Sequence, residues 1–194
     1  MRRVIGIGET ILDILFKNNQ PTVAVPGGSV FNGLVSLGRA GVNVTFISEV
    51  GGDCVGEIIL NFMKDNGICT DNVMVYPERK SPISLAFLND KNDAEYSFYK
   101  DYPTLRLDVD MPEVTSEDIV MFGSFYAITP QLRDKVKELL DKARKVGAII
   151  YYDVNFRSTH AHEAIKLMPT ILENFEYADI VRGSNEDFGN MFGM

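Results

Sequence analysis

Residues 27–56, GGSVFNGLVSLGRAGVNVTFISEVGGDCVG, contain a glycine turn, a helix pattern, a strand pattern and a second glycine turn, in that order. The stretch 29–40 predicts a helix with Ser29 as its N-cap, and Gly41 supplies the left-handed residue that commonly ends one. Residues 42–50 then form an apolar, β-branched run that indicates a buried strand. One helix followed by one strand is the repeating unit of an α/β fold.

A second helix is predicted directly after this strand. Asp53 is a suitable N-cap, and Gly67 ends a helix that runs to about Asn66. Four apolar positions are expected to share its buried face: Ile58, Ile59, Phe62 and Met63.

The same alternation continues on both sides of this stretch. Further strands are predicted at 3–7, 118–122, 148–152 and 178–181, and further helices from Thr129 to Gly147, at 163–175 and from Asn185 onward. Such alternation predicts an α/β fold with a mostly parallel sheet and helices on both faces. Ligands of such folds bind beyond the carboxyl ends of the strands, so polar residues that follow strands are the first candidates for a site.

A different pattern interrupts the alternation. Residues 81–88 and 94–99 are two strand-like runs around a polar turn, which predicts a hairpin, and the runs 11–16 and 22–25 can pair with it. These strands are expected to form a separate small sheet. Its aromatic residues are either core of that sheet, the interpretation we favour, or ligand contacts of a lid: Tyr96, Phe98, Tyr99 and Tyr102.

Composition excludes several classes of function. The 194-residue chain carries a net charge of −8, which argues against nucleic acid and anionic membranes as partners. Cys54 and Cys69 indicate neither a disulfide framework nor a zinc site. The chain has no apolar run of membrane-spanning length and no signal-peptide pattern, so we expect a cytoplasmic protein.

Two groups of residues have the chemistry of a polyol site. Gly27 and Gly28 let a ligand approach the start of a helix, Asn32 lies one turn further in, and the carboxylate of Asp13 can accept hydrogen bonds from two hydroxyl groups. A plain capped helix and a turn aspartate explain these residues about equally well. The second group, Asp153, Asn155 and Arg157, follows a strand, where the guanidinium can hold a phosphoryl group or form an ordinary loop salt bridge.

Two nucleotide motifs fit poorly. Gly6-Ile7-Gly8 follows a strand as in a dinucleotide-binding turn, but Ile11 occupies the place of the third glycine. A phosphate-binding loop of the GxxxxGK[ST] type is absent. A nicotinamide-dependent oxidoreductase therefore stays only as a minor alternative.

Taken together and in order, these segments resemble the PfkB/ribokinase family of carbohydrate kinases. The matching residues are Gly8-Glu9 with Asp13, Gly27-Gly28 with Asn32, Gly38, Gly41, Val50-Gly51-Gly52-Asp53 with Gly56, the hairpin 81–99, and Asp153, Asn155 and Arg157. The resemblance covers essentially residues 1–194. It implies one ribokinase-like three-layer domain, truncated at its C-terminus, with a β-sheet lid built from strands at about 11–25 and 81–100.

The resemblance also implies a reaction, in which the γ-phosphoryl of ATP passes to a hydroxymethyl group of a sugar. It assigns substrate contacts to Asp13, Gly27, Gly28, Asn32, Asn155 and Arg157, with Arg157 also near the phosphoryl group and with Phe98 and Tyr99 closing over the sugar. Fructose or another hexose is the first expectation, followed by ribose, a keto-deoxy sugar acid and a nucleoside. Dimerisation through the lid sheet is also implied.

Two departures from the family pattern bear on activity. The family's Asn-X-X-Glu motif, linked to magnesium, reads Asn185-Glu186-Asp187-Phe188 here, which leaves Glu186 as a candidate metal contact. The Gly-Ala-Gly-Asp run that carries the family's catalytic base is absent from the 194 residues, so the base is expected beyond Met194. The nucleotide-binding strands that the resemblance implies after this point are also missing from the 194 residues. We therefore expect an N-terminal portion that is inactive alone and uses ATP and Mg²⁺ only when complete. The alternative is a non-catalytic sugar-binding or dimerisation module.

Overall fold

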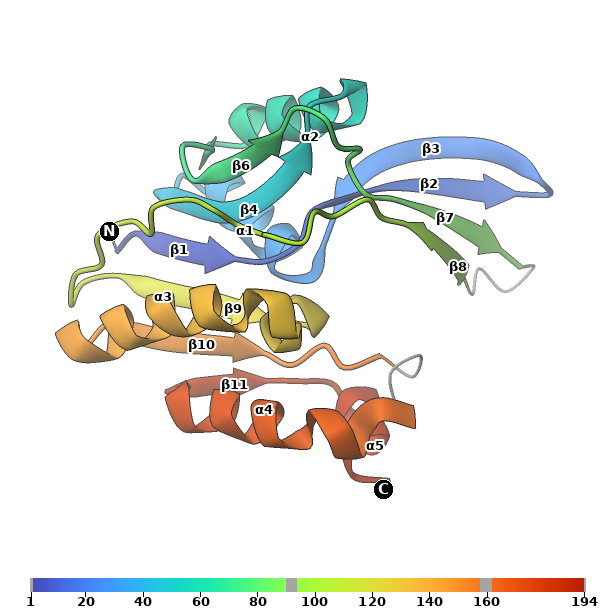
Figure 1. Cartoon of the computed structure of the whole chain (residues 1–194). Coiled ribbons are helices and arrows are strands. Elements are labelled where there is room, and N and C mark those ends of the chain that lie inside the picture. The colour runs from blue at the N-terminus through green and yellow to red at the C-terminus, as the bar shows by residue number, and fades with distance from the viewer. Residues whose placement is uncertain (1, 90–93, 158–161, 194) are drawn as a thin grey trace.

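A computed structural model describes residues 2–89, 94–157 and 162–193. Its main sheet has seven strands, in the order β11-β10-β9-β1-β4-β5, with β6 also paired to β4 (Figure 1). Every pairing in this sheet is parallel. The strands are β1 (Val4–Ile7), β4 (Val44–Gly51), β5 (Ile68–Cys69), β6 (Val73–Tyr76), β9 (Ile119–Gly123), β10 (Ile149–Asp153) and β11 (Ile180–Arg182).

Helices cover both faces of this sheet, as the sequence predicts. One apolar core lies between the sheet and α1 and α2, and a second lies between the sheet and α3 and α4. Along β1, Val4 belongs to the first core and Ile5 to the second, as the period of two in a strand requires. The helices are α1 (Ser29–Arg39), α2 (Cys54–Asp65), α3 (Arg133–Val146), α4 (Ala164–Tyr177) and α5 (Asn185–Phe192).

The predicted small sheet is also present. Its order is β3-β2-β7-β8, in which β2 pairs antiparallel with β3 and parallel with β7, and β7 pairs antiparallel with β8. The strands are β2 (Ile11–Lys17), β3 (Gln20–Gly27), β7 (Ile83–Leu88) and β8 (Ala94–Tyr99). We call this sheet the lid sheet; it projects from the end of the main sheet (Figure 1).

Glycine ends the helices where the sequence predicts. Gly41, Gly67 and Gly147 all have positive φ, at 79°, 72° and 76°, which L-residues with a Cβ rarely adopt. Among the described helices, none is both long and apolar enough to cross a bilayer.

Several local predictions are wrong. Ser29 is not the N-cap of α1: Gly28 occupies that position, and Ser29 is the first helical residue. The helix expected from Thr129 begins at Arg133, after the 3₁₀ turns η1 (Phe125–Ile128) and η2 (Pro130–Leu132). Ile58 is 48% exposed, so the buried face of α2 is narrower than predicted.

The aromatic residues of β8 are not core, contrary to the interpretation we favoured. Tyr96, Phe98 and Tyr99 are 53%, 55% and 57% exposed. β8 is an edge strand of the lid sheet, so its side chains have neighbours on one side only. The alternative, an aromatic surface free to meet a ligand or a partner, agrees with their exposure.

Candidate functional site

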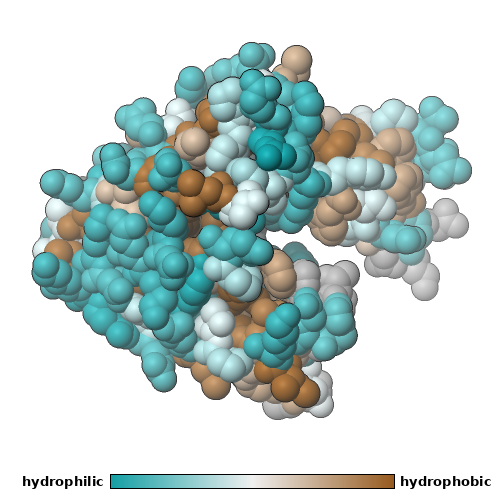
Figure 2. All heavy atoms as spheres, viewed as in Figure 1, coloured by the Kyte–Doolittle hydropathy of each residue, from teal (hydrophilic) through white to brown (hydrophobic). Residues whose placement is uncertain are grey.

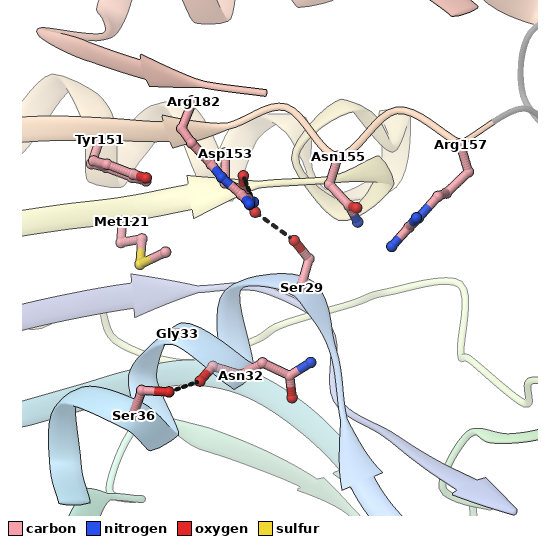
Figure 3. A pocket seen from close by; sticks show the side chains of 10 residues that line it. All are labelled: Ser29, Asn32, Gly33, Ser36, Met121, Tyr151, Asp153, Asn155, Arg157 and Arg182. Carbon is pink, nitrogen blue, oxygen red and sulfur yellow. Dashed lines mark hydrogen bonds and ion pairs between the residues drawn. The ribbon is translucent and has the colours of Figure 1, made fainter. Parts of the chain in front are cut away.

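A cavity of about 460 Å³ lies between the start of α1 and the ends of the central strands (Figure 3). It opens at the carboxyl edge of the parallel sheet, where α/β folds bind their ligands. Figure 2 shows a hollow between the lid sheet and the part of the molecule that carries α4 and α5. The cavity is lined by Ser29, Asn32, Gly33, Ser36, Met121, Tyr151, Asp153, Asn155, Arg157 and Arg182.

The segment after β10 carries two of the predicted contacts into this cavity. Asn155 and Arg157 both extend from it toward α1 (Figure 3). Asn155 has a left-handed backbone with φ of 40° and donates a hydrogen bond from Nδ2 to Ser124 Oγ at 3.2 Å. Asparagine tolerates this conformation better than most residues. The Arg157 side chain is exposed and no hydrogen bond or ion pair to it is found among the described residues.

Asp153 holds the two sides of the cavity together. Its side chain is buried, and its carboxylate accepts a hydrogen bond from Ser29 Oγ at 2.7 Å and one from Arg182 Nη1 at 2.9 Å. The start of α1 and the end of β11 are thereby tied to one carboxylate at the end of β10. Sequence reasoning placed Asp153 in the site but missed Ser29 and Arg182 as its partners.

Asp13 and Gly27 lie together at the base of the lid sheet. Ser84 Oγ donates a hydrogen bond to Asp13 Oδ1, and a Cβ on Gly27 would overlap Asp13 Oδ2. Gly28 follows with φ of 141°, and a Cβ there would overlap the carbonyl oxygen of Glu9. Asn32 continues into the cavity one turn further along α1. The structure thus gathers Asn32, Asn155 and Arg157 in one cavity and places Asp13 beside Gly27 next to it.

Three neighbouring effects set the pKa of Asp13. Burial raises the pKa of Asp13 above its ordinary value, the hydrogen bond from Ser84 lowers it, and the nearby carboxylate of Glu9 raises it further. The net direction is upward. Glu9 is itself held by Lys100 Nζ at 2.7 Å and by Tyr102 Oη at 2.6 Å, which ties the segment after β8 to the end of β1.

Phe98 and Tyr99 leave β8 on opposite faces of the lid sheet. They are consecutive in β8, so their side chains point to opposite faces of the lid sheet. Phe98 pairs with Ser84, which pairs with Asp13, whereas Tyr99 pairs with Ile83. Phe98 therefore shares the face of Asp13. Both residues also line a second cavity of about 550 Å³ between the lid sheet and the start of α2.

A buried ion pair that sequence reasoning missed supports this region. Arg106 and Glu49 are 9% and 1% exposed, and Arg106 Nε donates to Glu49 Oε1 at 2.9 Å. Tyr76 and Tyr126 add hydroxyl donors to Glu49 at 2.8 and 3.3 Å, and the ring of Tyr102 lies 3.6 Å from the guanidinium. The sequence signal for this ion pair was Glu49, a glutamate in the middle of a mostly apolar strand. A buried charge needs a partner, so such a residue predicts a cation close by.

The residues of the altered Asn-X-X-Glu motif lie at the start of α5, and a metal contact at Glu186 stays a prediction. Asp187 Oδ2 accepts from the backbone and hydroxyl of Ser184 in a capping box at the start of α5, and Phe188 packs against the core. Glu186 is exposed in the first turn. Among the described residues, no three acidic, histidine or cysteine side chains gather as a metal site. The exposed guanidinium of Arg157 in the cavity has the chemistry to contact a phosphate group.

The catalytic base is not assigned to any residue of this site. Sequence reasoning expects it beyond Met194, and Met194 itself lies outside the described residues. That expectation therefore stays a prediction.

The family model for pfkB carbohydrate kinases matches residues 1–194. The chain belongs to this family. A curated pfkB relative, probable fructokinase-6 of Arabidopsis thaliana, is 26% identical over 95% of this chain and 51% of its own length. This pfkB chain thus spans about half of that relative.

Solved structures share the pfkB fold of this chain. Fructokinase from Vibrio cholerae O395 in its apo form superposes with a TM-score of 0.83 at 19% identity, over 99% of this chain and 67% of its own. The same enzyme with fructose, ADP and calcium bound gives a TM-score of 0.83 at 19% identity, over 100% of this chain and 64% of its own. The α/β fold with a separate lid sheet is therefore confirmed.

Proposed function

We propose that this chain is the sugar-binding part of a pfkB carbohydrate kinase that acts on fructose or a closely related sugar. The observation that carries the proposal is the convergence of Asn32, Asn155 and Arg157 on one cavity at the carboxyl edge of a parallel sheet. Amide groups hydrogen-bond sugar hydroxyls as donors and acceptors. Fructose is chosen first because the relative and the neighbour above are named fructokinases.

In the proposed reaction, a sugar hydroxymethyl oxygen attacks the γ-phosphorus of ATP. The bond to the bridging oxygen breaks, ADP leaves, and the hydroxyl proton passes to a base, which we place beyond Met194. Asp13, Gly27, Gly28 and Asn32 hold the sugar, and Arg157 meets the phosphoryl charge in the cavity. Such catalysis rests on positioning and electrostatic stabilisation. ATP supplies the transferred group, and the metal contact at Glu186 stays a prediction.

We also propose that the 194 residues alone bind sugar without transferring phosphoryl. No Gly-Ala-Gly-Asp run occurs in the sequence, and general-base catalysis typically contributes about 10²–10⁴-fold. The second candidate function, a non-catalytic sugar-binding module, rests on the same absence. Heat on titration with ATP would exclude a pure sugar-binding module, because such a module binds no nucleotide.

Calorimetry tests the binding proposal. The purified chain is titrated with fructose, ribose, a keto-deoxy sugar acid, a nucleoside and ATP, and ADP release is followed in parallel. We expect heat with one sugar class, about tenfold weaker binding in Asn32→Ala and Arg157→Ala, and unchanged binding in the control Lys142→Ala, on the exposed side of α3. Absence of heat with every sugar rejects the sugar site, and ADP release above the blank rejects the inactivity.

We further propose that residues 1–194 form one cytoplasmic domain that dimerises through the lid sheet. Val23 and Val25 on β3 are 50% and 39% exposed and add to the exposed aromatic rings of β8. Apolar patches of this kind commonly mark protein interfaces. Light scattering on the purified chain should give twice the monomer mass. The Phe98→Glu variant should give the mass of one monomer. A monomer at high concentration contradicts this proposal.

A further inference from the structure

Ser84 lies at the centre of the lid sheet and has no assigned role. It is 0% exposed in β7, between β2 and β8. Its register partners are Asp13 on β2 and Phe98 on β8, so the three side chains point to the same face. A buried hydroxyl must be hydrogen-bonded to avoid a desolvation penalty, and Ser84 Oγ donates to Asp13 Oδ1.

The Asp13 carboxylate is held on both sides. Ser84 occupies Oδ1, and Oδ2 lies against Gly27, where any Cβ would overlap it. Rotation of the carboxylate would break the first contact and leave the buried hydroxyl without an acceptor. An ionised carboxylate has about four lone-pair positions, so acceptor capacity for two further hydroxyl groups remains.

The charges around Asp13 do not otherwise favour an ionised carboxylate. Glu9 is the charged group that faces it, and the cations and hydroxyls nearby are directed at Glu9, namely Lys100 and Tyr102. Among the described residues, no lysine or arginine donates a hydrogen bond to Asp13. Ser84 is therefore the neighbour that opposes the effects of burial and of Glu9.

We propose that Ser84 is a positioning residue that fixes the Asp13 carboxylate in one orientation, with its free lone pairs presented to adjacent hydroxyl groups of the sugar. The inference rests on the proposed sugar site and deepens it. The ligand class is a polyol with two neighbouring hydroxyls. A carboxylate that is fixed in advance loses less ordering entropy on binding than one that rotates freely.

The test first measures Asp13 directly, without any sugar. The ¹³Cγ resonance of Asp13 is titrated by NMR in the wild type, Ser84→Ala, Ser84→Thr and the control Ser97→Ala, an exposed serine on the opposite face of the lid sheet. Removal of the Ser84 hydroxyl should raise the pKa of Asp13 further. The threonine variant keeps a hydroxyl and should return the midpoint toward the wild type, and Ser97→Ala should leave it unchanged.

Sugar binding then tests the consequence. Ser84→Ala should bind fructose about tenfold more weakly than the wild type at neutral pH. As the pH is lowered, its affinity should be lost at a higher pH than that of the wild type, because the carboxyl becomes protonated earlier. Ser84→Cys keeps the volume with only a weak donor, so it reports the hydrogen bond if the alanine variant does not fold.

The outcomes separate this inference from the sugar site itself. An Asp13 midpoint that does not move in Ser84→Ala or Ser84→Cys overturns the role of Ser84, whether or not sugar binds. A wild type that binds no sugar rejects the proposed function, while a shifted NMR midpoint would still establish that Ser84 sets the state of Asp13. A shifted midpoint with unchanged fructose affinity rejects the positioning role.

Discussion

Replacing Arg106 with methionine should destabilise this protein more than any exposed arginine substitution. The side chain of Arg106 is buried against Glu49, which is 1% exposed and receives further donors from Tyr76 and Tyr126. Methionine has a similar length but no charge, so the substitution leaves the Glu49 carboxylate buried without its cation. The two tyrosine hydroxyls remain and satisfy only part of its acceptor capacity.

The expected magnitude follows from the burial of the pair. Breaking a buried ion pair by removal of one partner typically costs about 3–5 kcal/mol of the free energy of unfolding. For a domain of this size, about 1 kcal/mol lowers Tm by roughly 2–4 °C, so the variant should melt about 6–20 °C below the wild type. The melting temperature of Arg106→Lys should lie between those of the wild type and Arg106→Met, because an ammonium keeps the charge but not the planar stacking on Tyr102.

Chemical unfolding with two controls measures this effect. Arg79→Met removes an exposed pair with Asp101, with side chains 44% and 43% exposed, and should cost less than about 1 kcal/mol. In the double variant Arg106→Met with Glu49→Gln, the unpaired charge is gone, so its loss of stability should be clearly smaller than the sum of the two single losses. A cost below about 1 kcal/mol for Arg106→Met, or strict additivity in the double variant, would refute the reasoning.

Three further predictions concern a titrating pair and two glycines. Burial by itself would raise the pKa of Asp118. Hydrogen bonds from Arg3 and from Thr115 outweigh it and hold the pKa of Asp118 below the ordinary 3.8. The stability from this depressed pKa is therefore present at neutral pH and lost as pH falls through the folded value. Asp118→Asn should cost about 1.5–3 kcal/mol at pH 7 and less at pH 3, and equal urea midpoint shifts at both pH values would contradict this. Gly147→Ala should lower the free energy of unfolding by about 1–2 kcal/mol, because φ at this position is 76°. No atom lies within 4 Å of the new Cβ, so the loss would come from backbone strain and not from a clash. An unchanged Tm would exclude strain. Gly27→Ala should displace the Asp13 carboxylate and weaken fructose binding about tenfold, while a calorimetric affinity equal to that of the wild type would show that this contact is not used.

Local sequence signals predicted most elements because they depend on neighbouring residues alone. The apolar spacing from Leu132 to Ala143 placed five side chains in the core, and all five are 0% exposed. β5 and β6 were missed because strands of two and four residues carry too few positions for a period to show. The 3₁₀ start at Pro130 was missed because proline at the first turn fits both helix types.

The sequence by itself determined the alternation of strands and helices, the glycine stops, the hairpin of the lid sheet and the family motifs, since each is a pattern within a short window. Only the tertiary structure decided which distant groups meet. The contact of Ser84 with Asp13 requires the parallel register of β2 and β7, and the pair of Arg106 with Glu49 requires the chain to return over β4 after the lid sheet. These contacts depend on pairing between remote segments, for which periodicity along the chain carries no information.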